Sequence, residues 1–271
     1  MPAQREVTIQ RRRDGAHETR GDLVAVEDPL EIRLSHPGLG PAPITLSLTM
    51  RTPGHDAELA VGYLYCEAVI AERSQIVSIA ACVGNARALR VELTGSLPDL
   101  SPLQRVGTMS SSCGVCGKTS LESVTTVSAA RTVAGVATVE DSVLRRLPVA
   151  LRAAQPTFAL TGGLHGVGLF DLTGKLLAAR EDVGRHNALD KLIGQALLQD
   201  KLPFTDHILL LSGRASFELL QKASMAGASI VAAVGAPSSL AIEMAQAAGI
   251  TLVGFLSERG YNVYTHGERV G

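Results

Sequence analysis

The second half of the chain carries three continuously apolar runs, with amphipathic segments before and between them. The apolar runs are residues 208–211, 230–234 and 250–256, and the amphipathic segments are residues 187–198, 216–226 and 239–248. The runs predict buried strands, and the segments, with apolar residues at helical spacing, predict helices. Gly227 and Gly249 end the last two helices. Single helices between buried strands indicate parallel strands covered on both faces, a three-layer α/β arrangement.

Three further elements are predicted before this alternation. Residues 139–154 are amphipathic and predict a helix, and residues 157–160 predict a buried strand that ends in Thr161-Gly162-Gly163. Residues 167–170 and 175–179 flank a turn and predict a hairpin. The α/β domain therefore opens with a hairpin.

The first half mixes short strands with one helix. Strands are expected at residues 23–26, 30–34 and 44–50, a helix at 56–70, and a hairpin of 76–83 with 88–93, whereas residues 1–20 are expected to form a frayed or edge segment. The predicted organisation is an N-terminal α+β subdomain (1–105), a flexible loop (106–120) and a C-terminal α/β domain (121–271).

Composition narrows the function classes. The chain has 271 residues, is 46% hydrophobic and 19% charged, and carries a net charge of -1, which indicates a globular protein with no global attraction to nucleic acid or anionic lipid. It has no Trp, which argues against base-stacking surfaces. Charged residues from Glu27 to Arg33 interrupt any early apolar run, and no later run is long enough to span a membrane. We expect a cytoplasmic protein.

Residues 108–118 lack apolar periodicity and contain the spacing Cys113-x-x-Cys116, with Lys118 close behind. We interpret this stretch as a mobile thiol arm. The thiolate is the reactive form of cysteine, and a nearby ammonium favours it. Such a thiolate can take up sulfane sulfur as a persulfide, with the second thiol assisting. A possible capping box, Thr119-x-x-Glu122, favours a helix after the arm, whereas the composition of residues 124–127 favours a strand.

The paired thiols have other interpretations. A zinc site completed by Cys66 and Cys82 requires ligands from two separate elements. A thioredoxin-like couple normally has aromatic and proline neighbours that are missing here. A zinc deaminase requires His-x-Glu, which the chain lacks, and has Pro where Ser112 stands. Cys66 and Cys82 are expected to be ordinary buried thiols.

Glycine, serine and arginine follow several predicted strands. These groups are Gly162 and Gly163, Ser212, Gly213 and Arg214, residues 235–239, and residues 257–260. Ligands of such sheets bind beyond the carboxyl ends of the strands, and the helix N-termini there favour anions. We interpret these loops as an anion or nucleotide site. The alternative is that they are ordinary turn residues.

The densest polar run of the domain is residues 180–187, which leads directly into a predicted helix. One interpretation is a solvated turn capped by Asp182 or Asn187. The other is a wall of the site, with Arg185 and His186 contacting an anion.

Four motifs together resemble the FdhD family, which is required for formate dehydrogenase activity. They are residues 111–117, 161–165, 180–191 and 212–216, and the resemblance runs from about residue 20 to the C-terminus. It implies a homodimeric sulfurtransferase whose C-terminal half has a cytidine-deaminase-like fold. It implies that a cysteine desulfurase supplies sulfur, which passes to the molybdenum or tungsten of a bis-molybdopterin guanine dinucleotide cofactor before formate dehydrogenase receives it.

The resemblance also implies residue roles. Cys113 matches the persulfide carrier and Cys116 supports it. The family's cofactor segment near the C-terminus matches the residues Phe255, Leu256, Ser257, Glu258, Arg259 and Gly260. Two alternatives stay open, a non-catalytic carrier of the molybdenum cofactor and a redox-sensing nucleotide-binding module. Neither predicts an interaction with nucleic acid or membrane.

Overall fold

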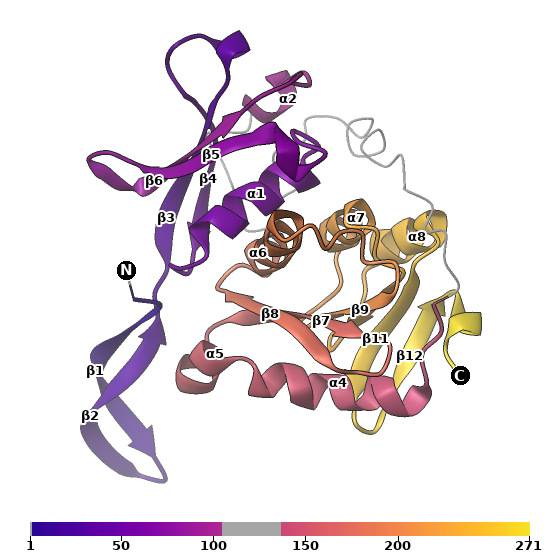
Figure 1. Cartoon of the computed structure of the whole chain (residues 1–271). Coiled ribbons are helices and arrows are strands. Elements are labelled where there is room, and N and C mark those ends of the chain that lie inside the picture. The colour runs from indigo at the N-terminus through magenta and orange to yellow at the C-terminus, as the bar shows by residue number, and fades with distance from the viewer. Residues whose placement is uncertain (1, 105–136) are drawn as a thin grey trace.

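The computed structural model describes residues 2–104 and 137–271, and shows a projecting hairpin, a small sheet with one helix, and a larger sheet between helices (Figure 1). The hairpin pairs β1 (Gln4–Arg13) with β2 (Ala16–Ala25). For residues 2–20, the expectation of a frayed segment is wrong and that of an edge segment is confirmed, because β1 and β2 form a sheet of two edge strands. The pairing is local, and Asp14-Gly15, both with positive φ, form the turn.

The second sheet has four strands in the order β4-β3-β6-β5. Its strands are β3 (Asp28–Ser35), β4 (Ile44–Arg51), β5 (Ile76–Cys82) and β6 (Asn85–Leu93), and its helix is α1 (Asp56–Cys66). Short helical turns occur at η1 (Pro37–Leu39), η2 (Arg73–Gln75) and α2 (Ser101–Gln104). The predicted strands and hairpin are confirmed, but α1 ends before residue 70, where Ala68 takes a positive φ.

The third sheet has six strands in the order β12-β11-β10-β9-β7-β8. Its strands are β7 (His165–Asp171), β8 (Leu176–Asp182), β9 (His207–Leu211), β10 (Ile230–Ala233), β11 (Thr251–Ser257) and β12 (Gly260–Thr265). The helices are α4 (Asp141–Ala153), α5 (Pro156–Thr161), α6 (Arg185–Leu198), α7 (Phe217–Met225) and α8 (Ser239–Ala248), with the turn η4 (Gly267–Arg269) near the end. Strands β9, β10 and β11 are parallel, whereas β7 and β12 run antiparallel to their neighbours.

Helices cover both faces of this sheet, as the apolar runs predicted (Figure 1). One core, with residues such as Leu189, Leu209 and Val231, lies under α6, α7 and α8. The other, with Leu144 and Phe170, lies under α4. The three-layer α/β arrangement is confirmed. Among the described residues, no helix is long and apolar enough to cross a membrane.

Helices α1 and α6 join the two larger sheets through a close glycine contact. A Cβ atom at Gly62 would lie 1.9 Å from the carbonyl oxygen of Asp190, and one at Gly194 would lie 1.9 Å from that of Glu58. The backbones therefore meet directly, and one hydrophobic core runs from β3 to α8. The predicted domain boundaries fall at or within residues 105–136, outside the described ranges, and stay a prediction.

The strand expected at residues 157–160 is wrong, because these residues form the short helix α5. Pro156 occupies its first turn, and the Glu181 carboxylate of β8 accepts the N–H groups of Thr157 at 3.1 Å and Phe158 at 2.7 Å. Gly162, with φ 66°, ends the helix in the left-handed region. Thus Gly162 and Gly163 follow a helix and precede β7.

Candidate functional site

The predicted ligand loops meet at one edge of the large sheet. His165 at the start of β7 pairs with Asp182 at the end of β8, and Val167 pairs with Leu211 of β9. The loop after β9 therefore lies beside His165. We call this the strand-end edge, made of residues 162–165, 182–186, 212–216, 235–238 and 255–260.

Backbone contacts hold the loops of this edge against each other. Gly235 donates its N–H to the carbonyl of Gly213 at 3.0 Å, and Phe255 donates to Gly235 at 3.1 Å. A Cβ atom at Gly235 would lie 2.9 Å from the Arg214 nitrogen, so the glycine permits the contact. The loops after β9, β10 and β11 thus form one continuous surface.

Four basic side chains gather where β7, α6 and the loop after β9 meet. Burial lowers the pKa of His165, and the charges of Arg185, His186 and Arg214 lower it further. The Nε atom of Arg185 is buried and has no partner among the described residues, whereas Arg214 is exposed. His186 Nε2 lies 2.8 Å from the Glu218 carboxylate. Within the described part of the chain, Arg185 and Arg214 have no acidic partner, and the lowered pKa of His165 favours its neutral form.

Helices α6 and α7 begin at this edge, and no side chain in the described part of the chain caps either N-terminus. Ser216 occupies the N-cap position of α7, but its buried hydroxyl has no partner among the described residues. Ser238, by contrast, caps α8 by accepting the N–H of Ala241 at 3.3 Å. Free N–H groups at helix N-termini favour anions, so α6 and α7 both direct such groups to the edge.

Residues of two predicted ligand loops, 162–163 and 212–214, also make contacts that stabilise the fold. The Ser212 hydroxyl accepts the N–H of Gly166 at 2.8 Å, which ties the loop after β9 to β7. A Cβ atom at Gly163 would lie 3.4 Å from the methyl group of Ala25, so this glycine adjoins the base of the β1–β2 hairpin. Gly213 adjoins His165, whose Nδ1 atom would lie 3.3 Å from an added Cβ.

The segment 255–260 lies at the other side of the edge. Phe255 is 51% exposed and has φ 55°, whereas Leu256 is buried in the core below α4. Ser257 donates its hydroxyl to Gly260 at 3.0 Å, which closes the β11–β12 turn around the exposed Glu258 and Arg259. Four inter-strand steps separate β8 from β11, a distance of about 19 Å. Gly162 and Arg185 therefore lie towards one end of an extended surface and Arg259 at the other, and Arg214, which follows β9, lies between them.

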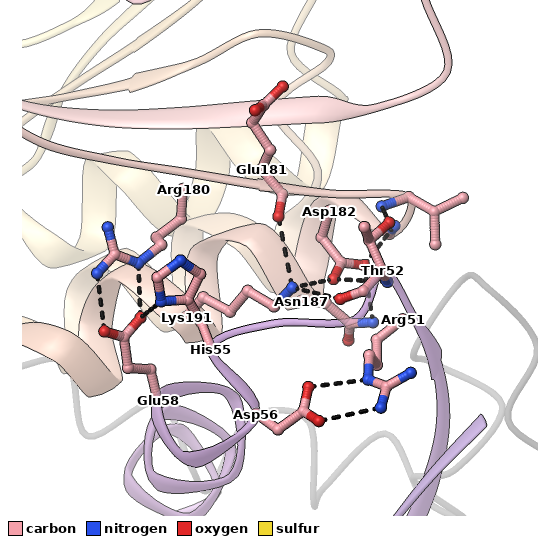
Figure 2. A network of polar contacts seen from close by, with 12 residues as sticks. Arg51, Thr52, His55, Asp56, Glu58, Arg180, Glu181, Asp182, Asn187 and Lys191 are labelled. Carbon is pink, nitrogen blue, oxygen red and sulfur yellow. Dashed lines mark hydrogen bonds and ion pairs between the residues drawn. The ribbon is translucent and has the colours of Figure 1, made fainter. Parts of the chain in front are cut away.

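The polar run 180–187 is neither a solvated turn nor simply a wall of the site. The Asp182 carboxylate is fully buried and lies 2.6 Å from the Lys191 ammonium, which is 1% exposed (Figure 2). Asp182 also accepts N–H groups from Gly184 at 2.8 Å and Thr52 at 3.1 Å. Burial raises the pKa of Asp182, and Lys191 opposes that rise. Asp182 and Asn187 are therefore buried members of a polar network, and the partly buried Arg185 and His186 lie between them in the first turn of α6.

This network reaches into the first half of the chain. Arg180 binds the Glu58 carboxylate with two hydrogen bonds of 2.5 and 2.7 Å, and Arg51 binds Asp56 in the same way at 2.8 and 3.0 Å (Figure 2). Sequence reasoning missed Arg51, Asp56 and Glu58. The charges of Asp190 and Lys191 within a helix that packs in the core indicate buried ion pairs, but their partners are Lys222 and Asp182. No local sequence signal identified Arg51, Asp56 or Glu58.

Cys113, Cys116 and Lys118, with the predicted helix cap and strand that follow them, lie outside the described residues. Cys66 is buried, and burial raises the pKa of its thiol. Cys82 is only partly buried, at the end of β5, so the expectation of a buried thiol is confirmed for Cys66 alone. Within residues 2–104 and 137–271, no group of three or more His, Cys, Asp or Glu residues is placed to hold a metal ion.

The fold is therefore that of a mixed α/β protein, in which basic side chains, close-approach glycines and helix N-termini lie along one edge of the large sheet. The chain belongs to the FdhD/NarQ family, whose model matches residues 25–271.

Curated relatives match nearly the whole chain. A protein of Mycolicibacterium paratuberculosis named Sulfur carrier protein FdhD is 47% identical over 278 residues, covering 97% of this chain and 99% of the relative. Proteins of the same name match from Mycobacterium tuberculosis at 48% identity, with 93% of each chain covered, and from Sulfolobus acidocaldarius at 41%, with 98% of each covered. The fold is shared with a crystal structure of a formate dehydrogenase accessory protein from Desulfotalea psychrophila, at a TM-score of 0.78 and 22% identity over the whole of both chains.

Proposed function

We propose that this protein is a sulfur carrier that acts in the maturation of formate dehydrogenase. Proteins named as sulfur carriers match nearly the full length of the chain at 47% and 48% identity, which supports this function. In the proposed reaction, the Cys113 thiolate attacks the terminal sulfur of a cysteine desulfurase persulfide. The sulfur–sulfur bond of the donor breaks, the donor leaves as a thiolate, and Cys113 becomes a persulfide.

The second step delivers the sulfur to the metal of a bis-molybdopterin guanine dinucleotide cofactor, which is the substrate. Attack of Cys116 on the inner sulfur of the persulfide releases the outer sulfur as sulfide. The two thiols supply the two electrons and form a disulfide, which a cellular dithiol reduces afterwards. The sulfide becomes a ligand of molybdenum or tungsten before the cofactor enters formate dehydrogenase.

The strand-end edge is the proposed holder of the cofactor's guanine nucleotide ends. Arg185, Arg214 and Arg259 would bind phosphate oxygens, the N-termini of α6 and α7 would add N–H donors, and the exposed Phe255 ring would contact the base. The observation that carries the assignment is that basic side chains and two helix N-termini without a side-chain cap, as far as residues 2–104 and 137–271 show, gather at this one edge. We further propose that the C-terminal half has a cytidine-deaminase-like fold and that the protein acts as a homodimer.

Mass spectrometry after incubation with a cysteine desulfurase and cysteine tests the carrier role. We expect the peptide that contains Cys113 to gain the mass of one sulfur atom, and a reductant to remove it. If neither Cys113 nor Cys116 gains sulfur while a known acceptor is loaded in parallel, the protein is a non-catalytic carrier of the cofactor.

The Cys113→Ala variant separates sulfur transfer from nucleotide binding. We expect it to lose formate dehydrogenase maturation in cells and to keep the wild-type Kd for guanosine diphosphate, because the thiol and the strand-end edge are separate parts of the chain. Cys66→Ala is the matched control, since that thiol is buried, and it should retain maturation. Loss of both properties in Cys113→Ala would contradict the division between the two parts.

A further inference from the structure

The turn that precedes α6 is bonded to the loop between β4 and α1. The Thr52 hydroxyl accepts the N–H of Val183 at 3.1 Å, while the Thr52 N–H donates to the Asp182 carboxylate at 3.1 Å. The Lys191 ammonium donates to the Thr52 carbonyl at 2.8 Å, so all three polar groups of Thr52 are used. Thr52 is 3% exposed. A single buried residue from the first half of the chain thus holds both ends of the Asp182–Lys191 pair.

The same contacts determine where α6 begins. Asp182 accepts the N–H of Gly184 at 2.8 Å and the side-chain amide of Asn187 at 3.2 Å, and Asn187 also donates to the Met50 carbonyl at 2.8 Å (Figure 2). These bonds lie on both sides of Arg185 and His186. Arg185 and His186 are therefore positioned by a turn whose hydrogen bonds are buried or partly buried.

A buried ion pair is not required for stability, because well-packed apolar side chains of similar volume often stabilise a core as well or better. The pair instead gives the turn a defined geometry, since each oxygen of Asp182 has its own donors. Groups held in this way support precise binding sites.

We propose that Thr52 and the Asp182–Lys191 pair are positioning residues for the strand-end edge. They hold the turn 183–186 so that Arg185 and the first N–H groups of α6 meet the phosphates of a guanine nucleotide. This inference deepens the proposed function and rests on it. In this proposal the β4–α1 loop supports the ligand site through its contacts with the turn 183–186, and Thr52 does not contact the ligand directly.

Substitution of Thr52 is expected to destabilise the fold less than substitution of Asp182 or Lys191, because loss of either member of the ion pair leaves an uncompensated buried charge. Thr52→Val keeps the shape and removes only the hydroxyl that accepts from Val183, whereas Thr52→Ser keeps that hydroxyl. Thr265→Val is the matched control. The buried Thr265 hydroxyl, at the end of β12, also accepts a backbone N–H, from Leu252 at 3.0 Å, and it donates to the Ile250 carbonyl at 2.6 Å. Thr265→Val therefore removes at least as many hydrogen bonds, but at the start of β11, opposite the strand-end edge.

Two measurements are made on each full-length variant. Calorimetry gives the Kd for guanosine diphosphate, and NMR hydrogen exchange follows the Gly184 amide, which has no bond to Thr52. For Thr52→Val we expect a Kd raised about three- to tenfold, the size of one lost hydrogen bond, and faster exchange at Gly184. Thr52→Ser and Thr265→Val should match the wild type in both measurements.

The outcomes separate the two proposals. If the wild-type protein binds no guanosine diphosphate, the proposed nucleotide site fails, and exchange at Gly184 alone decides whether Thr52 positions the turn. Unchanged exchange at Gly184 in Thr52→Val overturns the positioning role. Faster exchange with an unchanged Kd overturns the link between the turn and the site, as does an equal loss of affinity in Thr265→Val.

Discussion

His165 lies among cations, yet its own charge is suppressed. Burial lowers its pKa from the ordinary 6.5, and Arg185, His186 and Arg214 lower it further, so the folded protein favours the neutral imidazole. The unfolded chain therefore binds the His165 proton more tightly than the folded protein does. The stabilisation from neutral His165 is fully present above pH 6.5, and it is lost as the pH falls through the lowered pKa of the folded protein. A bound anion has the opposite effect, since it favours the imidazolium.

We expect guanosine diphosphate to bind with uptake of a proton by His165, and the affinity to rise as the pH falls from 8 towards 6. His165→Gln removes this titration and should flatten the pH dependence. Calorimetry across this pH range, on both proteins, gives the comparison, because the nucleotide's own phosphate titrates equally in both. Identical pH profiles for the two proteins would exclude His165 from the anion site.

At the scale of the elements, the backbones of α1 and α6 meet directly at Gly62 and Gly194. Gly194→Ala places a methyl group 1.9 Å from the Glu58 carbonyl, and a backbone atom cannot rotate away. We expect the free energy of unfolding to fall by about 1–3 kcal/mol or more, as for other overpacked cores. Urea unfolding measures it.

Gly267→Ala is the control for this prediction, because its Cβ would meet only a methyl group of Val263 at an ordinary 3.6 Å. It should unfold at the wild-type urea concentration. Equal stability of Gly194→Ala and the wild type would mean that the two helices separate at little cost.

Elements fixed by interactions between residues close in the sequence were predicted correctly, whereas elements fixed by distant residues were not. Helix α8 begins and ends where it was expected, because Ser238 caps its start and Gly249 ends it in the left-handed region. Helix α5 was mistaken for a strand, because its cap comes from Glu181, more than twenty residues later. A local pattern cannot report a partner supplied by a different strand.

The candidate site shows the same limit. Glycine, serine and arginine at strand ends predicted which loops meet at the edge, since parallel strands bring their carboxyl ends together. The role of Thr52 was not predictable, because its partners Asp182 and Val183 lie 130 and 131 positions away. The burial of Asp182 likewise depends on packing between the two halves of the chain.

For the whole molecule, the β1–β2 hairpin is the part that contributes least to the cores. Every residue of both hydrophobic clusters follows Ala25, and the distal part of the hairpin is exposed (Figure 1). Deletion of residues 1–26 should therefore change the Tm by no more than a few degrees. Differential scanning calorimetry of the shortened chain tests this, with guanosine diphosphate binding as a check on the remaining fold. A large fall in Tm would show that the contact of Ala25 with Gly163 supports the strand-end edge.

Asp190 and Lys191 are adjacent in α6 but pair in different directions, Asp190 with Lys222 at 2.7 Å and Lys191 with Asp182 at 2.6 Å. One residue corresponds to a rotation of about 100° around the helix axis. Turning α6 one way would bring Lys191 to Lys222 and Leu192 to Asp182; turning it the other way would bring Asp190 to Asp182 and Leu189 to Lys222. Either error leaves buried charges uncompensated, at a cost of several kcal/mol. The two adjacent charges therefore favour a single rotation of α6 about its axis. Both halves of the molecule pack against the helix in that orientation.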